Sequence, residues 1–372
     1  IEKNVIEWRH KIHQNPELSN REYKTAEMIA GHLKDLGLEV KTGVAHTGVV
    51  AILKGKNPGK TLALRADIDA LPVTERNDLP FKSEKTTEFL GEKTGVMHAC
   101  GHDAHTAILM GVAEVLNKNK HLLNGNIKFI FQPAEEGPPP GEKGGASLMI
   151  EEGVLTKPDV DAIFGLHIIS DIPVGKIHYK PGGFMAANER FEISVKGKGA
   201  HGGKPWDGVD PILISSKIID GLQTIISRES PLTNGPAVIS VGKITSGTRF
   251  NVVPESAEMA GTLRTLDADM REMIIKRMNE MVTSIAQAYG GEASIQFQSN
   301  TAITYNDLAL TAKMLPTFKN IAGEDNVELV KATTLGEDFS YFQEKVPGLF
   351  FFLGGMTPGN TTPYPHHHPQ FK

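Results

Sequence analysis

Residue types that bind metal ions are concentrated in five short stretches of this sequence. They supply a thiol, imidazoles and carboxylates, and they are Asp67-Ile68-Asp69, the stretch 97–105 (MHACGHDAH), the stretch 132–137 (QPAEEG), His167, and His366-His367-His368. Such a mixture of ligands suits zinc and similar divalent ions. A single His or Asp is more often a helix cap or a satisfied polar residue. Five such stretches together predict a metal centre.

The adjacent carboxylates Glu135 and Glu136 can have different roles, one as a metal ligand and one as a proton acceptor. Neighbouring side chains in an extended chain point to opposite sides, so one can bind metal while the other faces a substrate. Metal-assisted hydrolysis needs this combination of a ligand and a free carboxylate that takes a proton from water. Because a metal lowers the pKa of water to about 7, a modest base is sufficient.

Cys100 is the only cysteine of the chain. By composition alone it would be a small buried apolar residue. Its neighbours allow two other interpretations, a metal ligand or a nucleophile paired with His98, His102 or His105. A nucleophile pair leaves the other stretches unexplained, so we expect Cys100 to bind metal.

A single cysteine forms no internal disulfide, which is typical of a reducing compartment and predicts a cytoplasmic protein.

The metal-binding stretches must be positioned by elements that bring them together. Hydrophobic patterns predict strands at 49–54, 62–66, 127–131 and 162–167, and helices near 23–36, 105–116 and 146–152. Ser19 and Glu22 form a candidate capping box for the helix 23–36. Alternating strands and helices predict a mostly parallel sheet covered on both faces. Ligands bind beyond the carboxyl ends of such strands, where these stretches fall.

The pattern changes at about residue 184. The order becomes strand-helix-strand-strand-helix-strand, at 190–196, 211–226, 238–243, 257–265, 267–289 and 293–298. This order is ferredoxin-like. The α/β pattern then resumes, with elements at 308–321, 327–331, 339–345 and 349–353. We therefore expect an α/β/α catalytic domain from residues 1–183 and 298–372, with an inserted α+β domain at 184–297.

Composition excludes several other classes of protein. The chain has 372 residues, 40% of them hydrophobic and 22% charged, with a formal net charge of −5. These values fit a globular protein of two domains. The sequence has no basic patch of the kind that would indicate a nucleic-acid partner. It also has no apolar stretch long enough to indicate a membrane span. No leader peptide is recognisable at the start of the sequence.

Four stretches, in order, resemble one known family. They are 64–72 (LRADIDALP), 97–103 (MHACGHD), 132–137 (QPAEEG) and 199–202 (GAHG). They resemble the dinuclear metallopeptidase family of aminoacylases and carboxypeptidases, in the branch of hippurate hydrolase, indole-acetyl-amino-acid hydrolases and N-acetyl-diaminopimelate deacetylase. The resemblance covers nearly the whole chain. It implies hydrolysis of the amide bond of N-acyl amino acids or short peptides that have a free terminal carboxylate.

The resemblance also implies a role for each residue of the centre. Cys100 would bridge two divalent metal ions, zinc first, with manganese, cobalt or nickel as alternatives. The remaining ligands would be His102 and His167 for one ion, and Glu136 and His367 for the other. His367 is chosen because family members read His-x-Pro-x-Phe at this position, here His367-His368-Pro369-Gln370-Phe371. Glu135 would be the general base, and Asp69 would orient a group of the metal site. Asp67 stands where other branches have a ligating His, and we expect no ligand role for it.

Three residues of the inserted domain complete the implied site. His201 would act as a lid residue that reaches the partner subunit's site and stabilises the oxyanion. Asn251 and Arg264 would hold the carboxylate of the substrate. The inserted domain would then serve as a lid and as the contact surface of a homodimer or a dimer of dimers.

Two alternatives remain open at this point. Gly197 to Gly202 fits the dinucleotide pattern G-x-G-x-x-G, with Asp220 about 20 residues further on, which is compatible with an oxidoreductase. That pattern requires a helix to begin at the loop, whereas Pro205 to Gly208 delays the helix to about Pro211. A protein that only binds metal or peptide is the other alternative. Glu135, which has no ligand role in the resemblance, argues against it.

Overall fold

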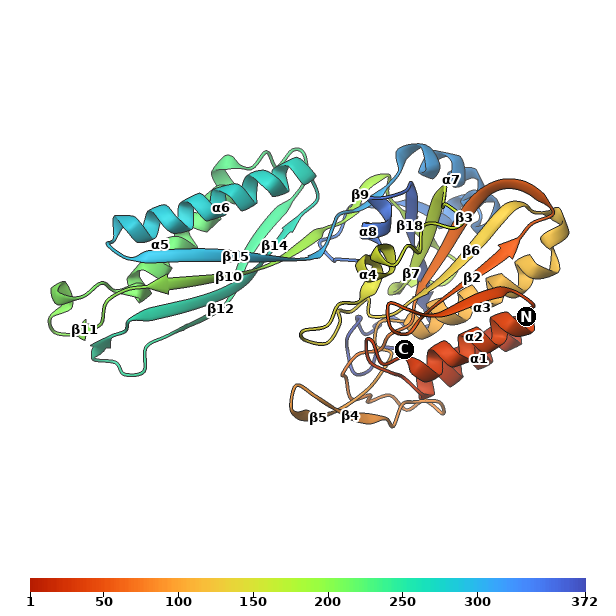
Figure 1. Ribbon diagram of the computed structural model, residues 1–372, viewed down its shortest axis with the longest axis horizontal. Coiled ribbons are helices and arrows are strands. Elements are labelled where there is room, and N and C mark those ends of the chain that lie inside the picture. The colour runs from red at the N-terminus through yellow and green to blue at the C-terminus, as the bar shows by residue number, and fades with distance from the viewer. The chain divides into compact units, whose positions relative to one another are not determined.

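The structure is a computed structural model that describes all residues, Ile1–Lys372, and the chain forms two compact units (Figure 1). Unit 1 comprises Ile1–Gly182, Tyr305–Lys331 and Asp338–Lys372. Unit 2 comprises Gly183–Thr304 and Ala332–Glu337. None of the helices combines the length and the apolar character needed to cross a membrane.

Unit 1 is built on an eight-stranded mixed sheet. In spatial order the strands are β1 (Glu39–Val44), β2 (Gly48–Lys54), β6 (Asn124–Gln132), β3 (Asn57–Asp67), β7 (Ala162–Pro173), β18 (Gly348–Met356), β8 (Ile177–Tyr179) and β17 (Val327–Leu329). The central strands β6, β3, β7 and β18 are parallel, as expected. The pairs β1–β2, β2–β6 and β18–β8 are antiparallel. The α/β class is confirmed, and its carboxyl-end edge is formed by the parallel strands.

Helices and short strands complete unit 1. They are α1 (Glu2–Gln14), α2 (Tyr23–Asp35), α3 (His102–Lys118), α4 (Gly145–Glu151), α7 (Leu308–Ala322), α8 (Ser340–Gln343) and the hairpin β4 (Thr86–Phe89) with β5 (Glu92–Gly95). One hydrophobic core lies between α2, α3 and the sheet, where Ile29, Leu33 and Met110 pack with Phe129 and Phe131. This packing fixes the start of α3, which carries His102, against the strands.

The start of α2 differs from the expected capping box. Glu22 is the N-cap residue, but its side chain makes no capping bond. The carboxylate of Glu17 accepts the backbone N–H groups of Lys24 and Thr25 instead, at 2.9 Å each. The prediction was wrong because the side chains of Ser19 and Glu22 are engaged elsewhere, near the metal-binding stretches.

Unit 2 has the expected ferredoxin-like core. An antiparallel sheet has the order β12 (Ala237–Ser246), β14 (Ser256–Thr265), β10 (Ala187–Lys196) and β15 (Glu292–Thr301). The helices α5 (Pro211–Thr224) and α6 (Ala268–Ala288) pack on it through a core that includes Phe191, Ile218 and Ile274. Asp210 and Asp267 cap the two helices through their side chains. Unit 2 also contains the short strands β11 (Ala200–His201) and β13 (Val252–Val253). The residues of the paired strands β9 (Gly182–Met185) and β16 (Thr304–Asn306) are divided between the two units.

Lys128 is a buried cation in the sheet of unit 1. It lies on β6 with 2% exposure, and burial lowers its pKa to about 8. Its Nζ donates to the carbonyls of Val154, Thr156 and Pro158, each at 2.9 Å. One side chain thus satisfies three carbonyl groups and holds the segment that connects α4 to β7.

Replacing Lys128 by Met should leave these three carbonyls without a donor. We expect the free energy of unfolding to fall by about 2–3 kcal/mol, measured by urea denaturation. Lys54→Met, at an exposed position of β2, is the matched control and should change stability by less than about 0.5 kcal/mol. Equal effects of the two substitutions would show that the three hydrogen bonds contribute no stability of their own.

Candidate metal centre

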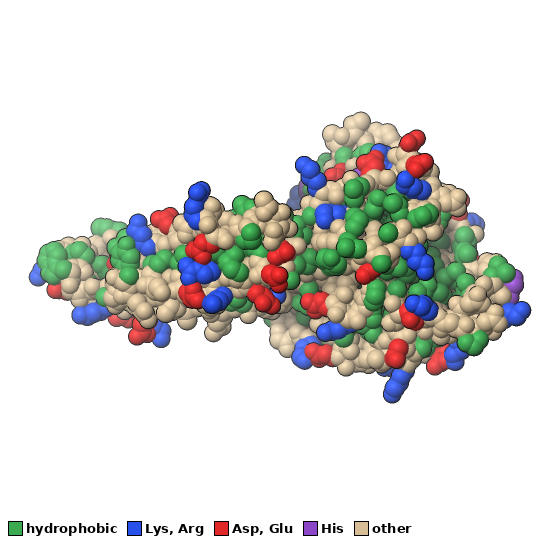
Figure 2. Space-filling model, turned by 90° about the horizontal axis from the view of Figure 1, so that it is seen from above, with side chains coloured by type: hydrophobic (Ala, Val, Ile, Leu, Met, Phe, Trp, Pro, Cys, Tyr) green, Lys and Arg blue, Asp and Glu red, His purple; other side chains and the backbone are tan.

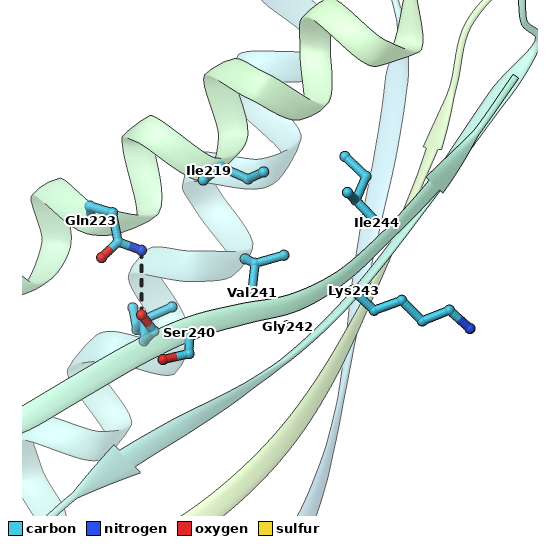
Figure 3. A pocket seen from close by; sticks show the side chains of 8 residues that line it. Ile219, Gln223, Ser240, Val241, Gly242, Lys243 and Ile244 are labelled. Carbon is cyan, nitrogen blue, oxygen red and sulfur yellow. Dashed lines mark hydrogen bonds between the residues drawn. The ribbon is translucent and has the colours of Figure 1, made fainter.

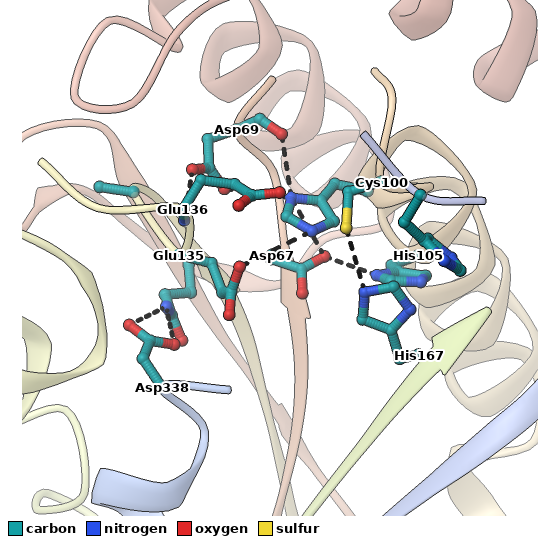
Figure 4. A network of polar contacts seen from close by, with 12 residues as sticks. Asp67, Asp69, Cys100, His105, Glu135, Glu136, His167 and Asp338 are labelled. Carbon is teal, nitrogen blue, oxygen red and sulfur yellow. Dashed lines mark hydrogen bonds and ion pairs between the residues drawn. The ribbon is translucent and has the colours of Figure 1, made fainter. Parts of the chain in front are cut away.

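The five metal-binding stretches meet at one place in unit 1 (Figure 4). Asp67 ends β3, Gln132 ends the parallel neighbour β6, and His167 lies on β7 beside β3. Cys100 and His102 stand at the entry to α3. The backbone N–H of His367 donates to the carbonyl of Ala99 at 2.7 Å, which fixes the last stretch beside Cys100.

Two groups of possible ligands share the thiol of Cys100. One consists of Cys100, His102 and His167, the other of Cys100, Glu136 and His367, and within each group the ligand atoms lie within 4.8 Å of one another. Two ligands of one tetrahedral zinc are about 3.6 Å apart for sulfur and nitrogen. Cys100 Sγ lies 3.4 Å from His167 Nε2, and His367 Nε2 lies 3.1 Å from Glu136 Oε1. The donor types and their spacing fit a pair of divalent metal ions.

The hydrogen bonds of two histidines leave a nitrogen lone pair facing this centre. His102 Nδ1 lies 3.0 Å from the carbonyl of Asp69 and 3.2 Å from its carboxylate, both of which are acceptors. Nδ1 therefore carries a hydrogen, and the buried Nε2, which has no hydrogen-bond partner, is the nitrogen at which a metal ion would take the place of a proton. His167 Nδ1 likewise donates to the carbonyl of Ile168 at 2.7 Å. This is the arrangement expected of metal-binding histidines.

His105 has no ring nitrogen free to bind a metal ion, although its side chain lies close to the centre. The N–H of Ile168 donates to His105 Nε2 at 2.8 Å, so Nδ1 carries the hydrogen and donates to Asp67 at 2.6 Å. Asp67 also accepts from Arg65 at 2.7 Å. Both side chains are thus engaged within the chain. Asp67, His102 and His105 also lie close enough together to form a possible ligand group, so the absence of a ligand role for Asp67 stays a prediction.

Negative charge accumulates around Cys100. Burial and the nearby carboxylates of Glu136, Glu135 and Asp67 raise the pKa of the thiol well above its usual value. Burial disfavours the charged form of His102, but Asp67, Asp69 and Glu136 outweigh it and raise the pKa of His102 to about 10. A bound cation would offset these charges and favour the thiolate. The same environment opposes a nucleophilic thiolate formed without a metal.

The three consecutive histidines at 366–368 have different surroundings. His366 Nε2 lies 2.9 Å from the carbonyl of Ile168, and His368 accepts the N–H of Gln370 at 3.1 Å and stacks on Tyr364. His367 alone belongs to a ligand group. The structure therefore places the histidine that was chosen from the sequence, and neither neighbour, beside Glu136.

A buried network of polar side chains lies beneath the centre and was not predicted from the sequence. Asp338 accepts hydrogen bonds from Arg65 at 3.0 Å, from Gln132 at 2.7 and 2.8 Å, and from the N–H of Ala146 at 2.8 Å (Figure 4). Arg65 also holds Asp67, so the network ties the ends of β3 and β6 to the start of α4 and to the loop that carries Asp338. The sequence offered one indication of this network, because a charged Arg65 inside an apolar strand needs a buried partner. Its partner Asp338 is too distant in sequence to identify.

Unit 2 carries the other three predicted site residues. His201 is exposed on β11, which pairs with β13, and Gly202 N–H donates to the carbonyl of Asn251 at 2.9 Å. Arg264 lies on β14, partly buried, and burial lowers its pKa. No helix begins at the glycine pattern 197–202; β11 lies within it and α5 begins at Pro211. The dinucleotide interpretation is therefore wrong.

Gly101 separates the two ligands Cys100 and His102. Its φ of 94° is in the left-handed region, and a Cβ there would lie 2.4 Å from Ile168 Cγ2. Glycine is the residue that tolerates both the conformation and the close approach. The spacing of the two ligands thus depends on this residue.

Gly101→Ala should weaken metal binding. We expect the variant to lose metal at a chelator concentration about tenfold lower than the parent protein does, measured by metal analysis after dialysis. Gly91→Ala is the control, because φ is 83° there and nothing lies within 4 Å of the added Cβ. Retention of the parent's metal affinity by Gly101→Ala would contradict this account.

The fold and the paired ligand groups define a metal-binding hydrolase. Residues 63–372 match the family described as peptidase family M20/M25/M40, and the chain belongs to that family. It is therefore an enzyme that hydrolyses amide bonds, as expected, and the non-catalytic alternative is set aside. Members of this family act on small molecules or peptides.

Individual relatives agree with this assignment. The chain is 43% identical to thermostable carboxypeptidase 2 of Saccharolobus solfataricus, over 100% of this chain and 91% of the relative. It is 39% identical to N-acetyl-L-cysteine deacetylase of Bacillus subtilis, over 100% of this chain and 84% of the relative. A solved Bacillus subtilis structure, described as a dinuclear metal-binding peptidase of the M20 family, matches with a TM-score of 0.81 and 37% identity, over 100% of this chain and 92% of that one.

Proposed function

We propose that this enzyme cleaves the amide bond of N-acyl amino acids or short peptides that carry a free terminal carboxylate, with Glu135 as general base. The observation that carries the proposal is the pair of ligand groups sharing Cys100, with Glu135 next to them: its Oε2 lies 3.9 Å from His102 Nε2. Relatives named as a carboxypeptidase and a deacetylase support the substrate class.

Two divalent ions, zinc in our proposal, would be held by Cys100 between them, by His102 and His167 on one side, and by Glu136 and His367 on the other. Bound there, they supply a Lewis acid for the amide carbonyl and lower the pKa of water. Manganese, cobalt and nickel remain alternatives. A ligating thiol must stay reduced, which favours the cytoplasm as the proposed compartment.

Glu135 takes a proton from the attacking water and passes it to the leaving amine. A carboxylate beside the metal ligands can take this role, because general-base catalysis needs a proton acceptor within reach of the water. Asp69 holds two groups beside this base in place, namely the ring of His102 and the backbone of Glu136. Its carboxylate accepts from His102 and, at 3.0 Å, from the backbone N–H of Glu136.

Arg264 and Asn251 are the proposed binding groups for the substrate carboxylate. The guanidinium of Arg264 is partly buried and forms no hydrogen bond or ion pair within the chain. Asn251 would donate to the carboxylate through the N–H groups of its side-chain amide. An unpaired, partly desolvated guanidinium binds a carboxylate through two hydrogen bonds.

Unit 2 is the proposed lid and the contact surface with a second copy of the chain. Strand β12 lies at the edge of its sheet, so its outer edge is open to pairing. Beside it a groove runs between α5 and β12, where Ile219, Val241 and Ile244 point inward and Lys243 points away (Figure 3). The open edge of β12 and the apolar groove beside it together favour a homodimer, or a dimer of dimers.

The end of unit 2 that carries β11 also has the character of a contact surface. Hydrophobic side chains gather at the end that carries β11 (Figure 2), and Trp206 and Phe250 are 76% and 97% exposed. His201 is exposed at this end. In the proposed dimer His201 reaches the partner subunit's site and stabilises the oxyanion.

Glu135→Gln should abolish turnover without loss of metal. We expect kcat for an N-acetyl amino acid to fall at least about 100-fold, because the amide cannot accept the proton. Metal content should remain that of the parent. Glu151→Gln, at an exposed position of α4, is the control. If kcat stays within about tenfold of the parent, Glu135 is not the base.

Sharing of the site between subunits is tested with hybrid dimers. His201→Ala and Glu135→Ala proteins should each be inactive, and mixing them should restore part of the activity, because one site of the hybrid has both residues intact. Subunit exchange is verified by mass spectrometry of differently tagged chains. Verified exchange without rescue would overturn the role of His201 across the dimer.

A further inference from the structure

The four residues 19–22, which we call the 19–22 segment, connect the start of α2 to three loops around the metal centre. Ser19 donates to Asp69 at 2.8 Å, and Asn20 donates to Glu142 and to the carbonyl of Lys143 at 3.0 Å each. Arg21 pairs with Glu142, and Glu22 accepts from Thr47 and Ala134. Capping of α2 is done by Glu17, so none of these side chains is needed for the helix.

Glu22 makes the contact nearest to the general base. Its side chain is fully buried, and its Oε1 accepts the backbone N–H of Ala134 at 3.0 Å. Ala134 directly precedes Glu135 and has a φ of 52°, in the left-handed region. An alanine in this conformation costs about 1–2 kcal/mol and persists only where its surroundings hold it. The hydrogen bond from Glu22 is one such restraint.

A second restraint lies on the other side of Glu135. The N–H of Glu136 donates to Asp69, which in turn accepts from Ser19. The backbone is therefore held one residue before and one residue after the base, and both restraints lead to the 19–22 segment. Ligand contacts can fix Glu136 through its side chain. The N–H of Ala134, in the peptide that follows Pro133, is held by Glu22, while the carbonyl of Ala134 accepts the N–H of Gly137 at 3.3 Å.

We propose that Glu22 is a positioning residue: by holding the N–H of Ala134, it fixes the backbone from which Glu135 reaches the water and the leaving amine. This inference rests on the proposed function of Glu135. Glu22 itself touches neither a metal ligand nor a substrate group.

The protonation state of Glu22 suggests how to test this role. Burial and the charge of Asp69 raise the pKa of Glu22 to about 8. Glutamine is therefore a close substitute for the neutral carboxyl group, because its carbonyl oxygen can still accept the N–H of Ala134. Leucine has a similar size and no acceptor.

The experiment compares three purified, metal-loaded variants with the parent. Glu22→Leu should lower kcat about tenfold to a hundredfold, with KM within about threefold and full metal content, because a small displacement of a catalytic group is costly. Glu22→Gln should restore kcat to within about threefold of the parent. Thr47→Val is the matched control: it removes the other hydrogen bond to the same carboxyl group and should leave kcat within about twofold.

Hydrogen exchange supplies a readout that does not depend on activity. In Glu22→Leu the amide of Ala134 should exchange faster, while the amide of Glu136, held by Asp69, keeps its protection. If Glu22→Leu does not fold, Glu22→Asp replaces it, since its carboxylate is one methylene too short to reach Ala134. The same fall in kcat is then expected.

Three results would overturn the inference: unchanged kcat in Glu22→Leu, an equal fall in Thr47→Val, or no recovery in Glu22→Gln. Failure of the proposed function has a different signature. It would appear as absent hydrolysis by the parent protein, or as an active Glu135→Gln variant, before any change at Glu22 is considered.

Discussion

The accumulation of buried negative charge at the carboxyl ends of β3 and β6 is the constraint on which the rest of unit 1 depends. Asp67, Asp69, Glu135 and Glu136 gather near Cys100 and His102, and burial together with Glu136, Glu135 and Asp67 raises the pKa of the Cys100 thiol. Such a cluster is stable only with compensating positive charge. Arg65 supplies part of it from below, through Asp67 and Asp338. Metal ions between the ligand groups would supply the remainder, which explains why the fold tolerates this arrangement.

Much of this arrangement was predictable from the sequence, for physical reasons. Parallel strands place their carboxyl ends at one edge, so residues that follow separate strands were expected to meet, and Cys100, Glu136 and His167 do so. The ferredoxin-like order of unit 2 follows from hydrophobic periodicity alone. The choice of His367 needed the family motif, because spacing does not distinguish three consecutive histidines.

Other features depend on contacts that no local pattern encodes. The pair Ser19 and Glu22 has the spacing of a capping box, yet Glu17 caps the helix and both side chains serve the centre. The network around Asp338 joins residues that are up to 273 positions apart. Helix α1 was not predicted, because its sequence is mostly polar and only Ile12 and His13 of it are buried. Polar groups with long-range partners are thus where the sequence was least informative.

The order of the ligands along the chain has a consequence for synthesis on the ribosome. Cys100, His102, Glu136 and His167 precede unit 2, whereas His367 follows it. Domains generally fold as they emerge, so the long insertion is made, and can fold, before the last ligand exists. A metal ion that arrives early meets three ligands of one group but only two of the other. With the proposed ligands, one group would be complete in the chain before unit 2 is made, whereas the other would be complete only after His367 has been added.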